Sequence, residues 1–374
     1  MAMVFDVPTD VSADILARLP TNARRRIRLA CRLWSDTVDE HAAVDMRRHD
    51  RILVVESPGL LDGVHVLSPE GSRAELWREL NDTTAWRYSR MNVVGTSNGL
   101  VCLCNDREPG GAITLANPST YEELRLPPLP TASSSVELYP RLGVKTWHLK
   151  YAFARHPETG LYKVVHVPGR YESFWEPGTL HVFRLGEASW RVVHAGPGAK
   201  CSPGLSSLAI IDATLYWLTE EEGDGKIMLF DLEYERVTHT EPLPVSAKSS
   251  RCRLTQVHGL LGVAVGSDDA STAVWVLEEG EWWNLRFVIE AHGVRQLATP
   301  HFAHGDCILT HGHGRHDQIN YLHQHKMHAG VVQIRRKGGQ EVTRLWKDIY
   351  RTFACLETKE QLSVYNAALV QAPS

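Results

Sequence analysis

A spacing of about 46 residues recurs through the second half of the chain and constrains its fold more than any other feature. Ala213, Gly259 and Gly305 lie 46 residues apart, and each introduces a strand-like apolar run. A leucine also follows an apolar run at intervals of 47, 45 and 45 residues; these leucines are Leu185, Leu232, Leu277 and Leu322. Two strands at fixed offsets in repeats of ~40–50 residues are typical of β-propeller blades. The spacing therefore predicts a ring of repeated sheets.

Six units of this kind can be placed after residue 50, with looser spacing at the start. They are 51–90, 91–130, 148–197, 205–244, 252–290 and 297–336. Their apolar runs are strand-sized, rich in β-branched and aromatic residues, and separated by Gly, Asn, Asp and Pro. The tail 340–370 contains Val342–Trp346, which we expect to help close the ring. The predicted fold is mainly β, a propeller of about six blades, and a pair of packed β-sandwiches is the alternative.

Residues 1–50 show a helical pattern instead. Val11, Ile15 and Leu19 recur every four residues, and Pro20 ends this stripe because the residue before a proline avoids the helical region. A second apolar face includes Ile27, Cys31 and Trp34. Some 45 residues in short helices bury too little apolar surface to be stable alone. We therefore expect this unit to pack on a partner or on the rest of the chain.

The helical head resembles the F-box motif. The matching segments are 7–11, 15–20 and 27–34, which follow the pattern Leu-Pro-x-Asp, Ile-Leu-x-Arg-Leu-Pro and an apolar–Cys–basic–x–Trp ending. Val7 replaces the customary leucine, and Arg24–Arg26 falls where such motifs often carry apolar residues. The resemblance implies an F-box domain over 1–50 that docks a Skp-type adaptor through Val7, Pro8, Val11, Ile15, Leu16, Leu19, Pro20, Ile27, Cys31 and Trp34. A plain helical cap on the following domain is the alternative.

The remainder, 51–374, resembles the F-box-associated domain of plant F-box proteins. The short motifs that carry this resemblance are Asn98–Cys102, Asn117–Thr120, Leu126–Pro130 and Leu215–Leu218. The resemblance implies a kelch-like or β-propeller domain that binds a protein target. Together with the head, it implies a substrate-recognition adaptor of a Skp–cullin–F-box ubiquitin ligase. Such a subunit reaches the cullin scaffold through the Skp-type adaptor and has no catalytic residues of its own.

The C-terminal third of the chain is rich in histidine, a residue that often binds metal ions. The two pairs His311/His313 and His323/His325 each place both imidazoles on one face of a strand. Zinc needs four ligands, and no cysteine or carboxylate completes either pair at a recognised spacing. We therefore predict no metal and no cofactor. Two alternatives stay open, a metal-binding propeller enzyme that uses these histidines and a structural propeller outside any ligase.

Two further motifs are interpreted as structural. Gly95–Gly99 matches the Gly-x-Ser-x-Gly pattern of hydrolases, but a strand follows the serine where such an elbow needs a helix, so we predict a turn. Cys102 and Cys104 alternate along one strand and are expected in the core.

Large aromatic residues in the two longest connections, 131–149 and 168–178, are the candidate target contacts. These residues are Tyr139, Trp147, Tyr171, Phe174 and Trp175. Aromatic side chains on loops held by a rigid scaffold are favoured anchors for a protein partner. The alternative is that they fold back onto the blades. Five other tryptophans lie in or beside predicted strands and are expected to pack the blades: Trp190, Trp217, Trp275, Trp282 and Trp283.

Composition and charge argue against disordered, nucleic-acid-binding, membrane and secreted proteins. The 374 residues are 43% hydrophobic and 22% charged with a net charge of −4, which fits a folded protein without a basic field for nucleic acid or membranes. The longest stretch free of charged residues, Met91–Asn105, is shorter than a membrane span. The N-terminus lacks the basic and apolar regions of a signal peptide, and seven scattered cysteines fit reduced thiols. We therefore expect a cytoplasmic and/or nuclear protein.

Overall fold

The structure is a computed structural model, and it describes the propeller region of the chain with gaps. The described residues are 51–56, 64–67, 73–75, 91–130, 146–168, 178–196, 208–219, 225–244, 252–257, 259–266, 271–278, 282–290, 301–304, 307–313, 320–326, 332–335, 340–345, 349–355 and 358–365. Residues 1–50 lie outside these ranges, so the predicted F-box and its boundary at residue 50 stay predictions.

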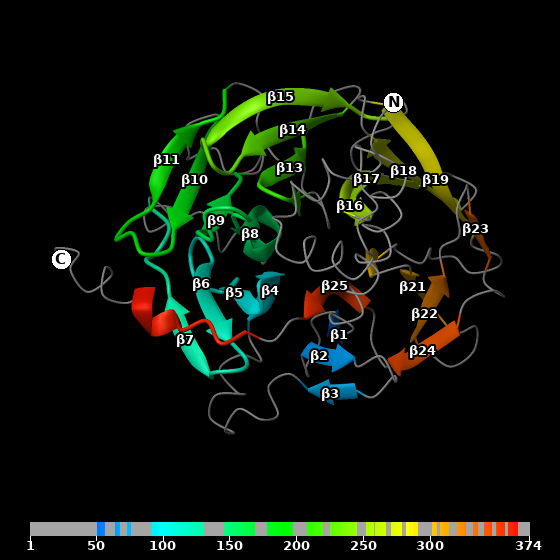
Figure 1. The fold of residues 1–374 in the computed structure, drawn as a ribbon, viewed down its shortest axis with the longest axis horizontal. Coiled ribbons are helices and arrows are strands. Elements are labelled where there is room, and N and C mark those ends of the chain that lie inside the picture. Colours follow the sequence, from blue (N-terminus) through cyan, green and yellow to red (C-terminus); the bar gives the residue numbers. More distant parts are fainter. Residues whose placement is uncertain are drawn as a thin grey trace, which may run out of the picture.

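Six sheets stand around a common axis and form a ring, and we number them as blades 1 to 6 (Figure 1). Blade 1 consists of β25 (Ile349–Cys355), β1 (Arg51–Glu56), β2 (Val64–Leu67) and β3 (Arg73–Glu75). Blade 2 consists of β4 (Asn92–Ser97), β5 (Leu100–Asn105), β6 (Ala112–Asn117) and β7 (Glu122–Arg125). Blade 3 consists of β8 (Tyr151–Arg155), β9 (Tyr162–His166), β10 (Thr179–Arg184) and β11 (Arg191–His194).

The second half of the ring repeats this order. Blade 4 consists of β12 (Leu208–Ile211), β13 (Thr214–Leu218), β14 (Lys226–Asp231) and β15 (Arg236–Pro242). Blade 5 consists of β16 (Cys252–Val257), β17 (Leu260–Gly266), β18 (Ser271–Glu278) and β19 (Trp282–Glu290), with β23 (Val332–Arg335) added at its edge. Blade 6 consists of β20 (His301–His304), β21 (Cys307–His313), β22 (Asn320–Lys326) and β24 (Gln340–Leu345). Two short 3₁₀ helices are described, η2 (Trp147–Lys150) and η5 (Leu362–Tyr365).

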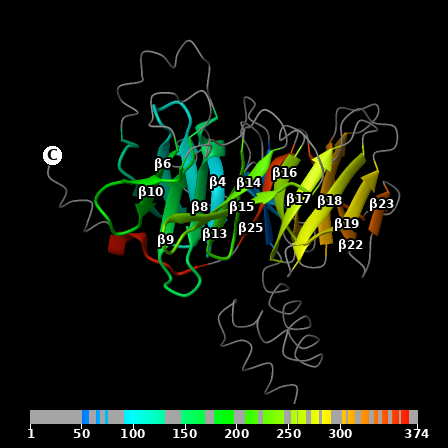
Figure 2. The same cartoon turned by 90° about the horizontal axis from the view of Figure 1, so that it is seen from above.

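The first strand given for each blade lies on the axis side of its sheet (Figure 1), and these inner strands contact one another in ring order: β25, β4, β8, β12, β16 and β20. Figure 2 shows the same ring from its edge. The ring closes in blade 1, where β25 from the end of the chain pairs antiparallel with β1, matching Arg51 with Cys355. This ring of blades confirms the predicted propeller and excludes the paired sandwiches.

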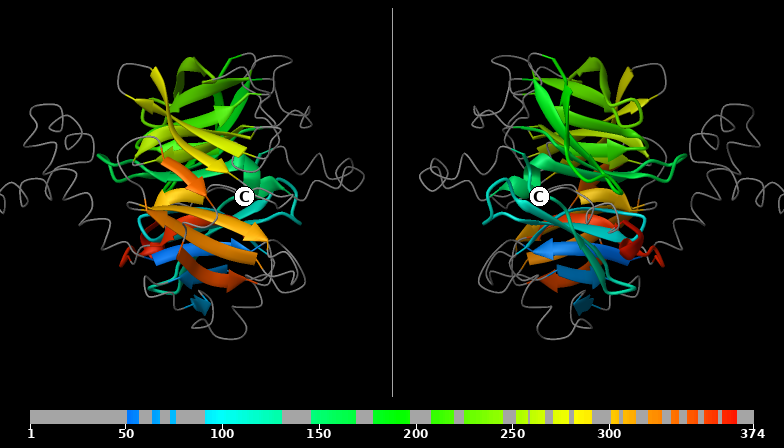
Figure 3. Two further views of the ribbon diagram at one scale, coloured as in Figure 1. Left: turned by 90° about the vertical axis from the view of Figure 1, so that its right-hand side faces the viewer. Right: turned by 90° about the vertical axis from the view of Figure 1, so that its left-hand side faces the viewer.

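Two details differ from the predicted units. β23 pairs in parallel with β19 of blade 5, and β24 forms the outer strand of blade 6 (Figure 3). The predicted unit 297–336 ends before β24 and therefore lacks this outer strand. Blade 1 is completed by β25 rather than by Val342–Trp346, most of which belongs to β24. The 46-residue spacing cannot predict either detail, because each depends on pairing between strands that are not consecutive in the sequence.

The Gly-x-Ser-x-Gly segment ends in the predicted turn, although its first three residues, Gly95–Ser97, belong to β4. Ser97 ends β4, and Asn98 and Gly99 have φ angles of 49° and 80°, which suit a two-residue hairpin turn with both central residues at positive φ. The Ser97 hydroxyl accepts a hydrogen bond from the backbone N–H of Arg155 at 2.9 Å. This serine therefore connects blades 2 and 3.

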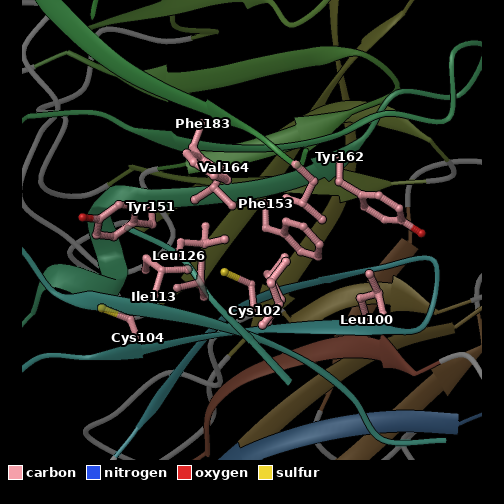
Figure 4. Close-up of a cluster of buried hydrophobic side chains, with 14 of the residues drawn as sticks. Leu100, Cys102, Cys104, Ile113, Leu126, Tyr151, Phe153, Tyr162, Val164 and Phe183 are labelled. Atoms are coloured by element: carbon pink, nitrogen blue, oxygen red, sulfur yellow. The ribbon is translucent and has the colours of Figure 1, made fainter. Parts of the chain in front are cut away.

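The core consists of apolar layers between neighbouring blades. The largest layer lies between blades 2 and 3 and includes Cys102 and Cys104, both fully buried, as predicted (Figure 4). Trp190 and Trp217 are buried in such layers too, whereas Trp282 is 74% exposed at the start of an outer strand, so its predicted packing role is wrong. Among the described residues no helix is long and apolar enough to cross a membrane.

Candidate target-binding face

The two faces of the ring carry different connections, because strand direction alternates within every blade. One face carries the hairpins that join the first strand to the second and the third to the fourth, such as 98–99, 212–213 and 232–235; we call it the turn face. The opposite face, the loop face, carries the connections between blades and the hairpins that join the second strand to the third, such as 106–111. Among these, 126–150 and 195–207 are far longer than any hairpin named above.

The chain enters the propeller from the turn face. β1 is the second strand of its blade, and its first residue, Arg51, lies beside Cys355 at the end of β25. The segment that follows β25 reaches the turn of blade 2, where Thr358 packs against Gly99. Residues 1–50 are therefore joined to the turn face, and the loop face is left as the candidate surface for a target.

Trp147, a predicted target contact, is part of the core. It begins η2, where the connection 126–150 returns to the blades, and its side chain is only 2% exposed. Gly111 has a φ of 73°, and a Cβ added there would lie 2.7 Å from the Trp147 Cβ. Trp147 thus packs against the blade 2 backbone and anchors the connection from inside, which contradicts its predicted role as an exposed anchor.

A buried polar network holds η2 against blade 2. The Asp106 carboxylate accepts hydrogen bonds from the His148 backbone N–H at 2.9 Å and from the Asn92 side-chain amide at 2.9 Å. It also pairs with His148 Nδ1 at 2.5 Å and accepts from the Cys104 thiol at 3.3 Å. A carboxylate that satisfies several buried donors fixes their geometry, so the end of the long connection is rigid.

A pair of buried histidines faces each other across β9 and β10 of blade 3. His166 ends β9 and His181 lies in β10, with their Nδ1 atoms 3.4 Å apart. The His166 ring lies 4.9 Å from the Tyr151 ring and 6.1 Å from that of Trp147. Burial holds the pKa of His166 well below its usual range, aided by His181 and Lys150, and burial lowers the pKa of His181 to about 4. Both rings are neutral near pH 7.

A pocket of about 460 Å³ opens between blades 2 and 3 beside the first residues of the connection 126–150. Its apolar lining includes Pro109, Leu126, Pro128 and Ala188. The Arg125–Glu108 ion pair, 2.6 Å long, forms its polar side. An apolar hollow with one pair of opposite charges suits a short peptide segment with an apolar side chain.

The described residues do not favour catalysis here. Cys104, Asp106 and His148 resemble a cysteine hydrolase set in composition, but the thiol donates to Asp106, is fully buried, and has its pKa raised well above normal by burial and by Asp106. A nucleophilic cysteine needs the opposite shift. No group of three or more metal-ligating side chains occurs in the described part of the chain. The side chains of His311, His313, His323 and His325 lie outside it.

Sequence reasoning missed the residues that hold the loop face. Asp106 and His148 are 42 residues apart, and no motif links them. The remaining predicted target contacts, Tyr139, Tyr171, Phe174 and Trp175, lie outside the described residues, as do all ten predicted adaptor contacts.

Comparisons with known proteins agree with this architecture. A family described as F-box associated beta propeller domain matches residues 59–358. The F-box protein At3g07870 of Arabidopsis thaliana is 25% identical over 304 residues, covering 73% of this chain and 69% of that protein. The F-box protein At1g52495 of the same plant is 24% identical over 309 residues, covering 75% and 68%. TolB from Acinetobacter baumannii matches in structure with a TM-score of 0.47 at 10% identity, covering 85% of this chain and 71% of that one.

The family match spans most of the chain and confirms the resemblance seen in the sequence: the chain belongs to the F-box-associated β-propeller family, as a plant F-box protein.

Proposed function

We propose that this protein is the substrate-recognition subunit of a Skp–cullin–F-box ubiquitin ligase, with its F-box on the turn face and its target on the loop face. At the family level, an adaptor role is what F-box proteins with this propeller share. The observation that carries the finer proposal is the entry of the chain at Arg51, which joins residues 1–50 to the turn face. The longer connections lie on the opposite face, and most of the pocket lining comes from residues 108–112 and 125–128 at that face.

The proposed mechanism is non-catalytic. The F-box binds a Skp-type adaptor and, through it, the cullin scaffold, while the propeller holds the target. Linking both partners through one rigid ring raises the effective concentration of target lysines near the charged conjugating enzyme. No side chain of this protein has to touch the reacting atoms.

Adaptor binding is tested with the full chain and a purified Skp-type adaptor. Leu19→Asp places a charge on the apolar stripe, and burying an unpaired charge costs several kcal/mol, so we expect co-purification to be lost. Leu19→Met conserves volume and should retain it. The proposal fails if the unmodified chain does not bind the adaptor at micromolar concentration.

Target binding at the loop face is tested with two matched tryptophan substitutions of exposed residues. Pro128→Trp fills the pocket, whereas Ser119→Trp places the same side chain on the turn face. Ubiquitination of the captured target should fall at least tenfold with the first and stay within twofold with the second. An equal loss from both variants would contradict the assignment of the target to the loop face.

The metal-enzyme alternative has its own measurement. Elemental analysis of the purified chain should give no stoichiometric zinc. A stoichiometric zinc signal that disappears in a His311→Ala/His313→Ala variant would favour that alternative instead.

A further inference from the structure

The segment after β25 crosses three blades along the turn face. β25 ends in blade 1, Thr358 packs on Gly99 of blade 2, and Tyr365 reaches Tyr162 of blade 3 with ring centroids 6.3 Å apart. The segment Thr358–Tyr365, which we call the clasp segment, ends in η5 beside β7 (Figures 1 and 3). It pairs with no strand, so its position depends on side chains of the blades.

Two blade side chains bind the backbone of the clasp segment. The Asn117 amide donates to the carbonyl oxygens of Thr358 at 3.2 Å and Glu360 at 2.7 Å. Its own oxygen accepts from the Ser119 N–H at 2.8 Å, which fixes the orientation of the amide. The Glu122 carboxylate accepts the N–H of Leu362 and the hydroxyl of Ser363.

One apolar side chain anchors the segment. Leu362 is fully buried in the layer between blades 2 and 3, while its neighbours Gln361 and Ser363 are exposed. The Tyr365 hydroxyl donates to the Glu360 carboxylate at 2.8 Å within the segment. Backbone hydrogen bonds combined with one deep side-chain pocket are how protein grooves bind linear peptides.

We propose that the surface formed by Gly99, Asn117, Glu122 and Tyr162, which we call the clasp groove, is a peptide-binding site, and that the chain's own clasp segment is its resident and releasable ligand. The site selects a peptide with a leucine at the position of Leu362, which is buried between blades 2 and 3. Only residues 356–357 separate the clasp segment from β25, so a high effective concentration keeps the groove occupied. The proposal does not depend on the ligase assignment.

The test releases the clasp segment in the full chain and supplies it in trans. Leu362→Asp removes the anchor, and a fluorescent peptide spanning residues 356–367 is then titrated while its anisotropy is measured. The peptide should bind the variant at least tenfold more tightly than the unmodified chain, whose groove is filled. A peptide with Leu362→Ala should lose at least tenfold, and one with Gln361→Ala should bind unchanged.

A second measurement decides the question if Leu362→Asp does not fold. Asn117→Asp keeps the oxygen that caps the Ser119 turn but replaces the two donors with a carboxylate facing two carbonyls. Hydrogen exchange of Leu362 and Ser363 should then accelerate at least tenfold relative to a Ser119→Ala control. The proposal is overturned if the peptide does not bind a folded Leu362→Asp chain, or if Asn117→Asp leaves this exchange unchanged.

Discussion

The turn face and the loop face are held by different kinds of contact. On the turn face, short hairpins are tied to neighbouring blades by charged groups: buried Lys163 donates to the Leu232 carbonyl and pairs with Glu235 at 2.6 Å. On the loop face, the return of a long connection is held by a buried tryptophan and a carboxylate network. The turn face thus combines short hairpins with charged contacts between blades, whereas the return of the connection 126–150 on the loop face depends on buried anchors.

The largest effect should come from removing the anchor of the loop face. Trp147→Ala deletes a fully packed aromatic side chain, for which core substitutions typically cost ~3–5 kcal/mol. Chemical denaturation should show this loss of unfolding free energy. Trp282→Ala is the control, because that side chain is 74% exposed, and its cost should stay within ~0.5 kcal/mol. Equal effects would contradict the assignment of Trp147 to the core.

The carboxylate network should give the next largest effect. Asp106→Ala removes the acceptor of the buried His148 ring and of the His148 backbone N–H, and each buried unsatisfied group costs about 1–3 kcal/mol. Asp231→Ala on the turn face removes only exposed turn hydrogen bonds to Glu233 and Tyr234 and should cost ~1 kcal/mol. Thermal melts of the two variants measure the difference, and a smaller loss for Asp106→Ala would refute the anchoring role.

Acid should weaken the loop-face side of blade 3. The pKa values of His166 and His181 are lowered in the folded state, so below about pH 6.5 the unfolded chain binds more protons than the folded one. Stability is therefore full above pH 6.5 and falls as the pH drops toward 4, by at most ~1.4 kcal/mol per pH unit for each histidine. Urea denaturation between pH 7.5 and 4.5 measures this slope.

A histidine variant isolates the cause of the acid dependence. His181→Phe removes one of the two buried titrating rings and should flatten the slope, while His194→Phe changes an exposed ring on β11 and should leave it as it is. An unchanged slope in His181→Phe would assign the acid sensitivity to other groups.

Alanine substitutions at two glycines with similar positive φ angles, one on each face, allow the two faces to be compared. Gly99 on the turn face and Gly196 on the loop face have φ angles of 80° and 84°. A Cβ at Gly99 would lie 2.7 Å from the Thr358 side chain, whereas one at Gly196 meets nothing within 4 Å. Both alanine variants lose ~1 kcal/mol from positive φ, and Gly99→Ala should lose more because it also displaces the clasp segment. Equal melting temperatures would contradict this contact.

The smallest effect should come from the ion pair beside the pocket. Arg125 is largely exposed and Glu108 is partly exposed, and surface pairs of this kind contribute ~0–1 kcal/mol. Arg125→Ala should therefore leave the melting temperature nearly unchanged. A large loss would show that the pocket wall is structural rather than available to a target.

The 46-residue repeat and the turn residues were sufficient to predict the ring. Each blade contributes apolar strands of regular spacing, and residues suited to positive φ mark hairpins such as Asn98–Gly99. Contacts between distant residues were beyond reach. Nothing in the residues around Asp106 predicts a partner at His148, and the repeat does not show that β25 rather than Val342–Trp346 completes blade 1. Trp147 was misjudged because a tryptophan in a long connection has the same local pattern whether it is exposed or anchors that connection.

Hydrogen exchange of the full chain, with and without a purified Skp-type adaptor, tests the division between the faces most directly. We expect protection within residues 1–50 and unchanged exchange on the loop face, including 106–111 and 146–150. Protection of those loop-face segments by the adaptor, or no protection anywhere, would contradict the assignment of the adaptor to the turn-face side and the target to the opposite side.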